Sequence, residues 1–161
     1  MLASVNCGRG VSRQSNMKSV TDVLRHKGAT HVWSVSPTDT VFSAIATMAQ
    51  REVGALTVMQ NDKLVGIVSE RDYTRKVILR DRSSKDTHVS EIMTYDVIEV
   101  APHDQIADCV KLMKNHHIRH LPVLDAGKVV GMLSLRDLFS EIIDEQADTI
   151  DQLQHYIRGE V

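Results

Sequence analysis

Two copies of one short phrase decide the fold of this chain: Gly66-Ile67-Val68-Ser69-Glu70-Arg71-Asp72 and, further along, Gly131-Met132-Leu133-Ser134-Leu135-Arg136-Asp137. In each copy an apolar run typical of a strand ends at a serine. A segment typical of a helix follows, with a cation and a carboxylate in its first turn. The unpaired amides of a first helical turn favour an anion. Each phrase therefore predicts a place that suits a phosphorylated ligand.

The repetition extends beyond the phrase. The offset that separates Gly66 from Gly131 also separates Pro37 from Pro102 and Met48 from Met113, and no gap is needed from position 32 to position 72. Each copy shows a strand, an amphipathic helix, a hairpin of two strands and a second helix. We therefore predict an α/β fold of the mixed α+β class, in which two β-α-β-β-α repeats are related by a pseudo-two-fold axis and pack their sheets together.

The boundaries of the predicted elements follow from periodicity and turn residues. In the first copy we expect strands at 32–35, 56–59 and 64–68 and helices at 40–51 and 70–79, with an Asn61-Asp62 turn in the hairpin. The whole chain divides into a disordered leader over 1–16, a first repeat over 17–80, a polar linker over 81–88, a second repeat over 89–143 and an amphipathic C-terminal helix over 144–161.

Composition excludes several kinds of partner. The chain has 161 residues, of which 42% are hydrophobic, so it can bury a core. Its formal net charge is -2 and only 4% of its residues are aromatic, which argues against a nucleic-acid binder. No apolar stretch approaches the length of a membrane span, so we expect no membrane partner. The two cysteines, Cys7 and Cys109, favour a reducing compartment, and we expect a cytoplasmic protein.

The side chains of the two phrases have complementary chemistry. The serines, Ser69 and Ser134, can cap a helix or donate to an anion; the arginines, Arg71 and Arg136, can bind phosphate; and the aspartates, Asp72 and Asp137, can accept from a vicinal diol such as a ribose. Ser-x-x-Asp is also the pattern of a capping box, in which the acid closes back on the cap residue. The residues alone leave both roles open.

The combined pattern resembles a tandem pair of CBS domains, the Bateman module, and in particular the small stand-alone CBS-pair proteins. The resemblance covers residues 20–143. It rests on the two phrases, on the lead-in segments Val35-Ser36-Pro37 and Val100-Ala101-Pro102, and on the stretch His117-Ile118-Arg119-His120-Leu121-Pro122-Val123.

The resemblance implies an adenosine-containing ligand between the repeats, such as AMP, ADP, ATP, NAD(H) or S-adenosylmethionine. Carried over by position, Asp72 and Asp137 would bind ribose, and Ser69, Arg71, Ser134 and Arg136 would lie near phosphate. Adenine would rest near Val35, Ser36, Pro37, Val100 and Pro102, and Arg119 and His120 would contact phosphate. Because the first repeat has Gly54 and Ala55 where the second has Arg119 and His120, we expect unequal clefts, with tighter phosphate binding in the one that faces Arg119 and His120. Which aspartate shares that cleft is left open.

The resemblance implies a nucleotide-sensing regulatory module that signals to a partner. We expect it to have neither catalytic activity nor a catalytic cofactor. The resemblance also implies a homodimer. A ligand-independent dimeric scaffold that regulates a partner enzyme is the alternative, and a small nucleotide-processing enzyme is a third hypothesis that lacks a catalytic set. We expect no metal site at His116, His117 and His120, because Arg119 lies among them and a strand-like Leu-Pro-Val follows. Cys109 matches Ala44 of the first repeat and is expected in the core.

Overall fold

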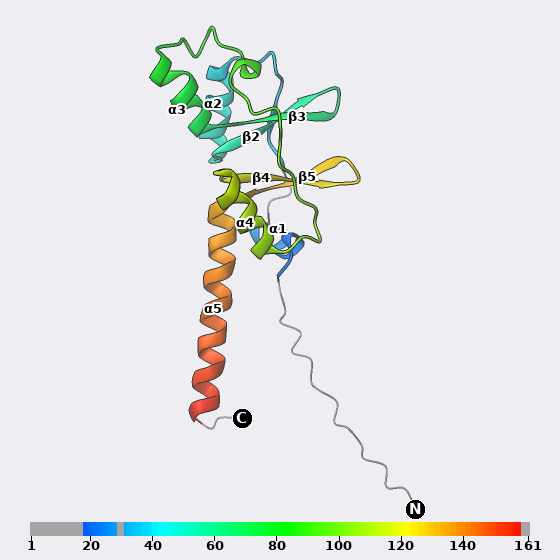
Figure 1. Ribbon diagram of the computed structural model, residues 1–161, viewed down its shortest axis with the longest axis vertical. Helices are drawn as coiled ribbons and strands as arrows, with labels where there is room; N and C mark the ends of the chain where they lie inside the picture. Colours follow the sequence, from blue (N-terminus) through cyan, green and yellow to red (C-terminus); the bar gives the residue numbers. More distant parts are fainter. Residues whose placement is uncertain (1–17, 29–30, 159–161) are drawn as a thin grey trace, which may run out of the picture.

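The computed structural model describes residues 18–28 and 31–158, which form two halves stacked on each other with a helix projecting from one of them (Figure 1). The first half contains β1 (Ser34–Val35), α2 (Val41–Arg51), β2 (Ala55–Gln60), β3 (Lys63–Ser69) and α3 (Glu70–Lys76). The second contains α4 (Ile106–His116), β4 (His120–Asp125), β5 (Lys128–Ser134) and α5 (Leu135–Arg158). Each half has its own hydrophobic core, and β3 contacts β5. The predicted mixed fold class is confirmed.

The two sheets are small and differ by one strand. In the first half β1 pairs parallel with β2, and β2 pairs antiparallel with β3. In the second half β4 and β5 form a two-stranded sheet, and the segment equivalent to β1 contributes a single parallel bridge from Val100 to Val123. The first hairpin turns through Asn61 and Asp62, whose φ angles of 50° and 60° suit the tight turn that the sequence predicts.

Strand register fixes the geometry of the two phrases. Ser69 at the end of β3 lies opposite Ala55, and Ser134 at the end of β5 lies opposite His120. The helix that follows each serine therefore begins beside the first residue of the neighbouring strand. This brings the two sequence signals, the phrase and the unequal Gly54-Ala55 and Arg119-His120 pairs, to the same end of each sheet.

The opening segment of each repeat packs into the other half. Helix α1 (Val20–Lys27) contributes Val20 and Val23 to the core of the second half, and Val20 N–H donates to the Asp104 carbonyl at 2.9 Å. The 3₁₀ helix η2 (Val89–Glu91) reciprocates, since Val89 is buried in the core of the first half. Figure 1 shows α1 beside α4 in the second half. The two repeats are thus tied together by crossed segments at either end.

The glycine that opens each phrase permits this crossing. A Cβ atom on Gly131 would lie 2.7 Å from Leu24 Cδ1, and a Cβ atom on Gly66 would lie 2.8 Å from Met93 Sδ. Leu24 lies on α1 and Met93 follows η2, so each glycine lies under the crossed segment of the opposite half. A side chain at either position would push that segment away from the strand.

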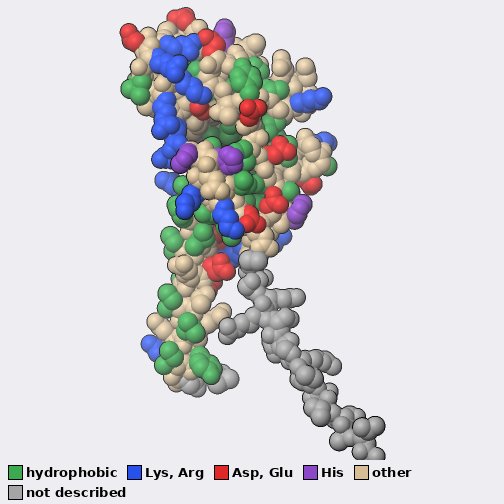
Figure 2. Space-filling view, viewed as in Figure 1, with side chains coloured by type: hydrophobic (Ala, Val, Ile, Leu, Met, Phe, Trp, Pro, Cys, Tyr) green, Lys and Arg blue, Asp and Glu red, His purple; other side chains and the backbone are tan. Residues whose placement is uncertain are grey.

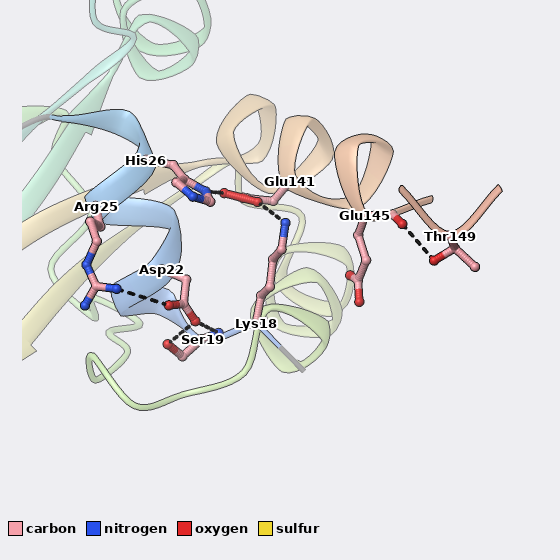
Figure 3. A network of polar contacts seen from close by, with 8 residues as sticks. All are labelled: Lys18, Ser19, Asp22, Arg25, His26, Glu141, Glu145 and Thr149. Carbon is pink, nitrogen blue, oxygen red and sulfur yellow. Dashed lines mark hydrogen bonds and ion pairs between the residues drawn. The ribbon is translucent and has the colours of Figure 1, made fainter. Parts of the chain in front are cut away.

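A buried carboxylate fastens α1 to α5 (Figure 3). Glu141 is only 5% exposed, and it accepts a hydrogen bond from Lys18 Nζ at 2.8 Å. Its other oxygen meets His26 Nδ1. Two cationic or polar groups from the N-terminal segment therefore satisfy one carboxylate on the final helix.

Two helices end or begin away from their expected bounds. The helix expected at 70–79 ends at Lys76 and is followed by a 3₁₀ turn, η1 (Ile78–Arg80). The helix expected from residue 144 is the second half of α5, which starts at Leu135 directly after the second phrase. The expected leader and Cys7 lie outside the described residues. Among the helices of the described ranges, none combines the length and the apolar character needed to cross a membrane.

Candidate functional site

Both phrases form the capping box, one of the two roles that the sequence left open. The Ser69 N–H and hydroxyl donate to Asp72 Oδ2 at 3.0 and 2.8 Å, and the Asp72 N–H donates to Ser69 Oγ at 3.2 Å. In the second phrase the Ser134 N–H donates to Asp137 Oδ2 at 2.8 Å, and the Asp137 N–H donates to Ser134 Oγ at 3.2 Å. These bonds fix each aspartate against the start of its helix.

Each of these aspartates also pairs with a lysine, from a different source in each phrase. Asp72 Oδ1 lies 2.9 Å from Lys76 Nζ, one turn along the same helix. Asp137 Oδ2 lies 2.9 Å from Lys27 Nζ, which comes from the crossed helix α1 and also donates to the Met132 carbonyl at 3.1 Å. The second aspartate is therefore connected directly to α1, whereas the first is not.

The first phrase opens onto a cleft of about 520 Å³, here called the Asp72 cleft. From the first half it is lined by Ser69, Arg71, Asp72 and Arg75, and from the second half by the segments 96–98 and 117–120. Residues of both repeats thus face one space. Its volume lies within the range of small-molecule sites, about 300–1,000 Å³.

The second phrase opens onto a related cleft of about 790 Å³, the Asp137 cleft. Ser134, Arg136 and Asp137 line it from the second half, and the segments 31–33 and 51–55 line it from the first half. Lys27 of α1 adds a further cation to its wall. The two clefts are therefore built from corresponding parts of the repeats with the roles of the halves exchanged.

The clefts share one wall, formed by Gly54, Glu70, Arg119 and His120. A Cβ atom on Gly54 would lie 3.2 Å from His120 Nε2, so the residues that the sequence singled out as an unequal pair pack directly against each other. Arg119 and His120 line both clefts, so they accompany each of the two aspartates. Arg119 and His120 therefore do not distinguish one cleft from the other, although the sequence predicted that they would. The clefts differ in their other cations, which are Arg71 and Arg75 in the Asp72 cleft and Lys27, Arg51 and Arg136 in the Asp137 cleft.

Three guanidinium groups line the Asp72 cleft, on Arg71, Arg75 and Arg119. Arg71 Nη1 donates to the His117 carbonyl at 2.7 Å, which holds the side chain across to the second half. Burial and the nearby charges of Arg119 and Arg75 lower the pKa of Arg71. An anion in this cleft would offset that repulsion, and guanidinium groups bind phosphate with charge-assisted hydrogen bonds.

His120 does not add to this positive charge near neutral pH. Burial lowers its pKa to about 4, and the cations Lys27, Arg119 and Arg71 act in the same direction against the opposing influence of Asp137. The imidazole is therefore neutral at pH 7. Of the Arg119-His120 pair, the arginine carries the charge and the histidine offers a neutral donor or acceptor.

The structure does not bring the expected lead-in residues into either cleft. Val35 and Val100 are buried in the cores, and neither they nor Ser36, Pro37 and Pro102 line the two spaces. Segments a few residues earlier do so instead: Val32-Trp33 in the Asp137 cleft and Val97-Ile98 in the Asp72 cleft. These pairs are related by the same offset as the two phrases, so the repeat was the sequence signal that could have pointed to them as cleft residues.

Trp33 gives the Asp137 cleft an aromatic wall. The guanidinium carbon of Arg51 lies 3.9 Å from the centre of the Trp33 ring, a cation–π contact. The His31 ring stacks on the same indole with centroids 5.6 Å apart. The sequence contains one tryptophan, so its fluorescence reports on this cleft.

Metal and thiol chemistry find no support in the part of the chain that the structure describes. Residues 18–28 and 31–158 contain no group of three or more His, Cys, Asp or Glu side chains placed to hold a metal ion. Cys109 is fully buried, and burial raises the pKa of its thiol to about 11. The thiolate that nucleophilic or redox chemistry needs is therefore scarce at this position.

Comparison with known proteins assigns the fold and the repeats to one family. The model of the CBS domain matches residues 20–78 and again residues 89–144. The chain belongs to the CBS domain family and carries a pair of these domains, which is a regulatory module.

Relatives and solved structures agree with this assignment. The CBS domain-containing protein CBSX3, mitochondrial, of Arabidopsis thaliana is 38% identical, over 97% of this chain and 84% of the relative. A solved protein with CBS domains from Burkholderia ambifaria MC40-6, named for signal transduction, is 44% identical with a TM-score of 0.77, covering 80% of this chain and 96% of that one. The CBS domain pair of protein MJ0100, solved in complex with 5′-methylthioadenosine and S-adenosyl-L-methionine, shares the fold at 21% identity and a TM-score of 0.70, over 81% of this chain and 98% of that one.

Proposed function

We propose that the chain is a nucleotide-sensing regulatory module without catalytic activity, which binds an adenosine-containing ligand between its two repeats. The observation that carries the proposal is the pair of corresponding clefts, each with a capped aspartate from one repeat and an arginine-bearing wall from the other. AMP, ADP, ATP and NAD(H) are the ligands of choice, because the Asp72 cleft gathers three guanidinium groups that suit phosphate. The adenosine compounds in the MJ0100 domain pair support the same class of ligand.

Different side chains would bind the ribose, the phosphate and the adenine of the ligand. Asp72 and Asp137 are acceptors at the start of their helices and would take the ribose hydroxyls. Arg71 and Arg119 would pair with phosphate in the Asp72 cleft. In the Asp137 cleft adenine would lie beside Trp33, whose indole already packs against Arg51 and His31.

The signalling mechanism is differential binding. Each cleft is lined by both repeats, so a bound ligand favours one arrangement of the two halves over others. A partner protein that binds this arrangement better then senses the nucleotide. The module would act as a homodimer in the cytoplasm; fractionation of cells decides the compartment, since the Arabidopsis relative is named mitochondrial.

A calorimetric titration with AMP, ADP, ATP, NAD, NADH and S-adenosylmethionine tests the proposal. We expect saturable binding and a rise in the unfolding temperature with at least one of them. A ligand in the Asp137 cleft should also change the fluorescence of Trp33. Substitution Arg71→Met should weaken binding of a phosphate-bearing ligand about tenfold or more, since a hydrogen bond to a charged group contributes about 1.5–3 kcal/mol. Lys114→Met, an exposed cation on α4 that lines neither cleft, is the matched control.

A ligand-independent scaffold is the second candidate, and one observation favours it. Asp72 and Asp137 are already engaged in capping boxes and lysine pairs, so their positions need no ligand to be stable. Absence of binding by all six compounds, with the fold intact, would support the scaffold and refute the sensor. Turnover of any of them would show instead that the module is an enzyme.

A further inference from the structure

The outer half of α5 extends away from the body of the protein (Figure 1). Every residue from Ile143 to Arg158 is exposed. Hydrophobic side chains nevertheless continue along this projecting part (Figure 2). The hydrophobic side chains of Phe139, Ile143, Ile150, Leu153 and Ile157 are between 50% and 81% exposed.

These side chains follow a heptad pattern. The residues Phe139, Ile143, Gln146, Ile150, Leu153 and Ile157 are separated alternately by four and three positions. Written as a heptad, isoleucine occupies every a position, and the d positions hold Phe139, Gln146 and Leu153. In a parallel coiled coil, isoleucine at a with leucine at d, the pattern of Ile150 and Leu153, favours two strands. The six layers span about 27 Å at roughly 1.5 Å per residue.

The positions that flank the stripe are uncharged. The e and g positions from residue 140 onward hold Ser140, Ile142, Ala147, Thr149, Gln154 and Tyr156. All charged residues of 144–158 occupy the outer b, c and f positions: Asp144, Glu145, Asp148, Asp151, His155 (when protonated) and Arg158. Two copies of this acidic helix can therefore meet in parallel without bringing like charges into the contact.

The body of the protein leaves this stripe uncovered. Leu138 and Glu141, which face the core and α1, are buried at c and f positions, on the other side of α5 from the a and d residues. A free helix of about 15 residues is marginal in water, and most of its stability comes from packing an amphipathic face. The projecting part of α5 thus has a face suited to a partner and a physical need for one.

We propose that this stripe binds the same stripe of a second copy of the chain, as a parallel two-stranded coiled coil. The contact is self-complementary, as a two-fold symmetric dimer requires. It gives the homodimer of the proposed function a specific interface and rests on that part of the proposal. It involves none of the residues that line the Asp72 and Asp137 clefts, so loss of this contact and loss of nucleotide binding can be told apart.

Sedimentation equilibrium of the full chain without nucleotide tests the proposal, with two variants that add the same charge to exposed positions of α5. Ile150→Glu places a carboxylate in the stripe and should raise the dimer dissociation constant roughly a hundredfold or more, because each dimer contains two substituted positions. Gln152→Glu places it at an outer c position and should leave the constant unchanged. A monomeric wild-type chain, or equal dissociation constants for the two variants, would overturn the proposal.

Cysteine cross-linking keeps the test decisive if Ile150→Glu merely frays the helix. In a Cys7→Ser background, Leu153→Cys should form an intermolecular disulfide readily, because equivalent d positions face each other in a parallel pair. Gln152→Cys should not form this disulfide. Cys109 is buried and is present in both variants, so it does not account for a difference between them. Equal cross-linking at the two positions would refute the parallel pairing. A wild-type chain that is monomeric by itself and forms a complex only with a different protein would also refute the proposal, because the stripe would then bind a different partner.

Discussion

Replacing either phrase glycine by alanine should destabilise the protein, and the cost should differ between the two repeats. Ordinary van der Waals contact begins near 3.4 Å, whereas the new Cβ atom would lie 2.7 and 2.8 Å from the two Leu24 methyl groups at Gly131. At Gly66 it would lie 2.8 Å from Met93 Sδ and 3.0 Å from the Thr94 carbonyl oxygen. Both substitutions therefore overpack the crossing of a helical segment over a strand.

The magnitudes follow from what can move. Overpacking typically costs about 1–3 kcal/mol. Leu24 ends in flexible methyl groups that can rotate, so we expect Gly131→Ala near the lower end of that range. The Thr94 carbonyl is fixed, since Thr94 and Ile67 exchange two backbone hydrogen bonds of 3.1 and 2.9 Å. Gly66→Ala should therefore cost about 3 kcal/mol.

Urea unfolding of the single and double variants provides the measurement. In a double-mutant cycle, Leu24→Ala should remove most of the penalty of Gly131→Ala, because it empties the space that the new methyl group needs. Met93→Ala should relieve Gly66→Ala only in part, because the backbone oxygen remains. The reasoning is refuted if Gly131→Ala changes stability by less than about 0.5 kcal/mol, or if the Leu24 cycle shows no coupling.

Three further predictions concern charge and reactivity. Burial opposes ionisation of Glu141, but hydrogen bonds from Lys18 and His26 outweigh it and lower its pKa below 4.5, so its contribution to stability is present above that pH and is lost as the pH falls. Glu141→Gln should therefore cost about 1–3 kcal/mol at pH 7 and flatten the acid limb of the unfolding free energy; an unchanged acid limb would contradict this. In a Cys7→Ser background, Cys109 should resist a thiol reagent at pH 8 until the protein unfolds; rapid native labelling would contradict its burial. Arg119→Gln should weaken ATP binding by calorimetry more than His120→Gln, because the histidine is neutral; the reverse order would contradict that charge state.

The internal repeat made much of the fold predictable. The hairpins and the two phrases could be recognised because turn residues and strand patterns are local signals, and the repeat showed each of them twice. The bounds of α5 escaped prediction, because the second phrase and the heptad stripe lie on one uninterrupted helix and only their roles change. At the clefts the sequence placed the lead-in residue Val35 in the site, whereas Val32 and Trp33 line the Asp137 cleft. Burial of Val35 in the core decides this, and burial is a property of the assembled sheet.

The crossing of α1 could not be deduced from the repeat. The segments around Val20 and Val89 resemble each other at a slightly longer offset than the one that relates Pro37 to Pro102. The connection between the opening segment and the rest of the repeat is therefore longer in the first repeat than in the second. Both segments present small apolar faces that fit either core equally well in composition. Chain connectivity and the close approach at Gly66 and Gly131 determine which core each one enters.

That crossing also determines how the molecule can respond to a ligand. One end of α1 holds Asp137 in its cleft through Lys27, and the same segment holds α5 through Lys18 and Glu141. A ligand at Asp137 would therefore act on α1 through Lys27, and a second copy on α5 would act on the same segment through Glu141 and Lys18. By linkage, the two binding events affect each other only to the extent that they favour different positions of α1. The Asp72 cleft lacks this connection, because its aspartate pairs with Lys76 on its own helix. Each cleft is lined by three arginines, so the inequality between the clefts resides in the attachment of the Asp137 cleft to α1 through Lys27.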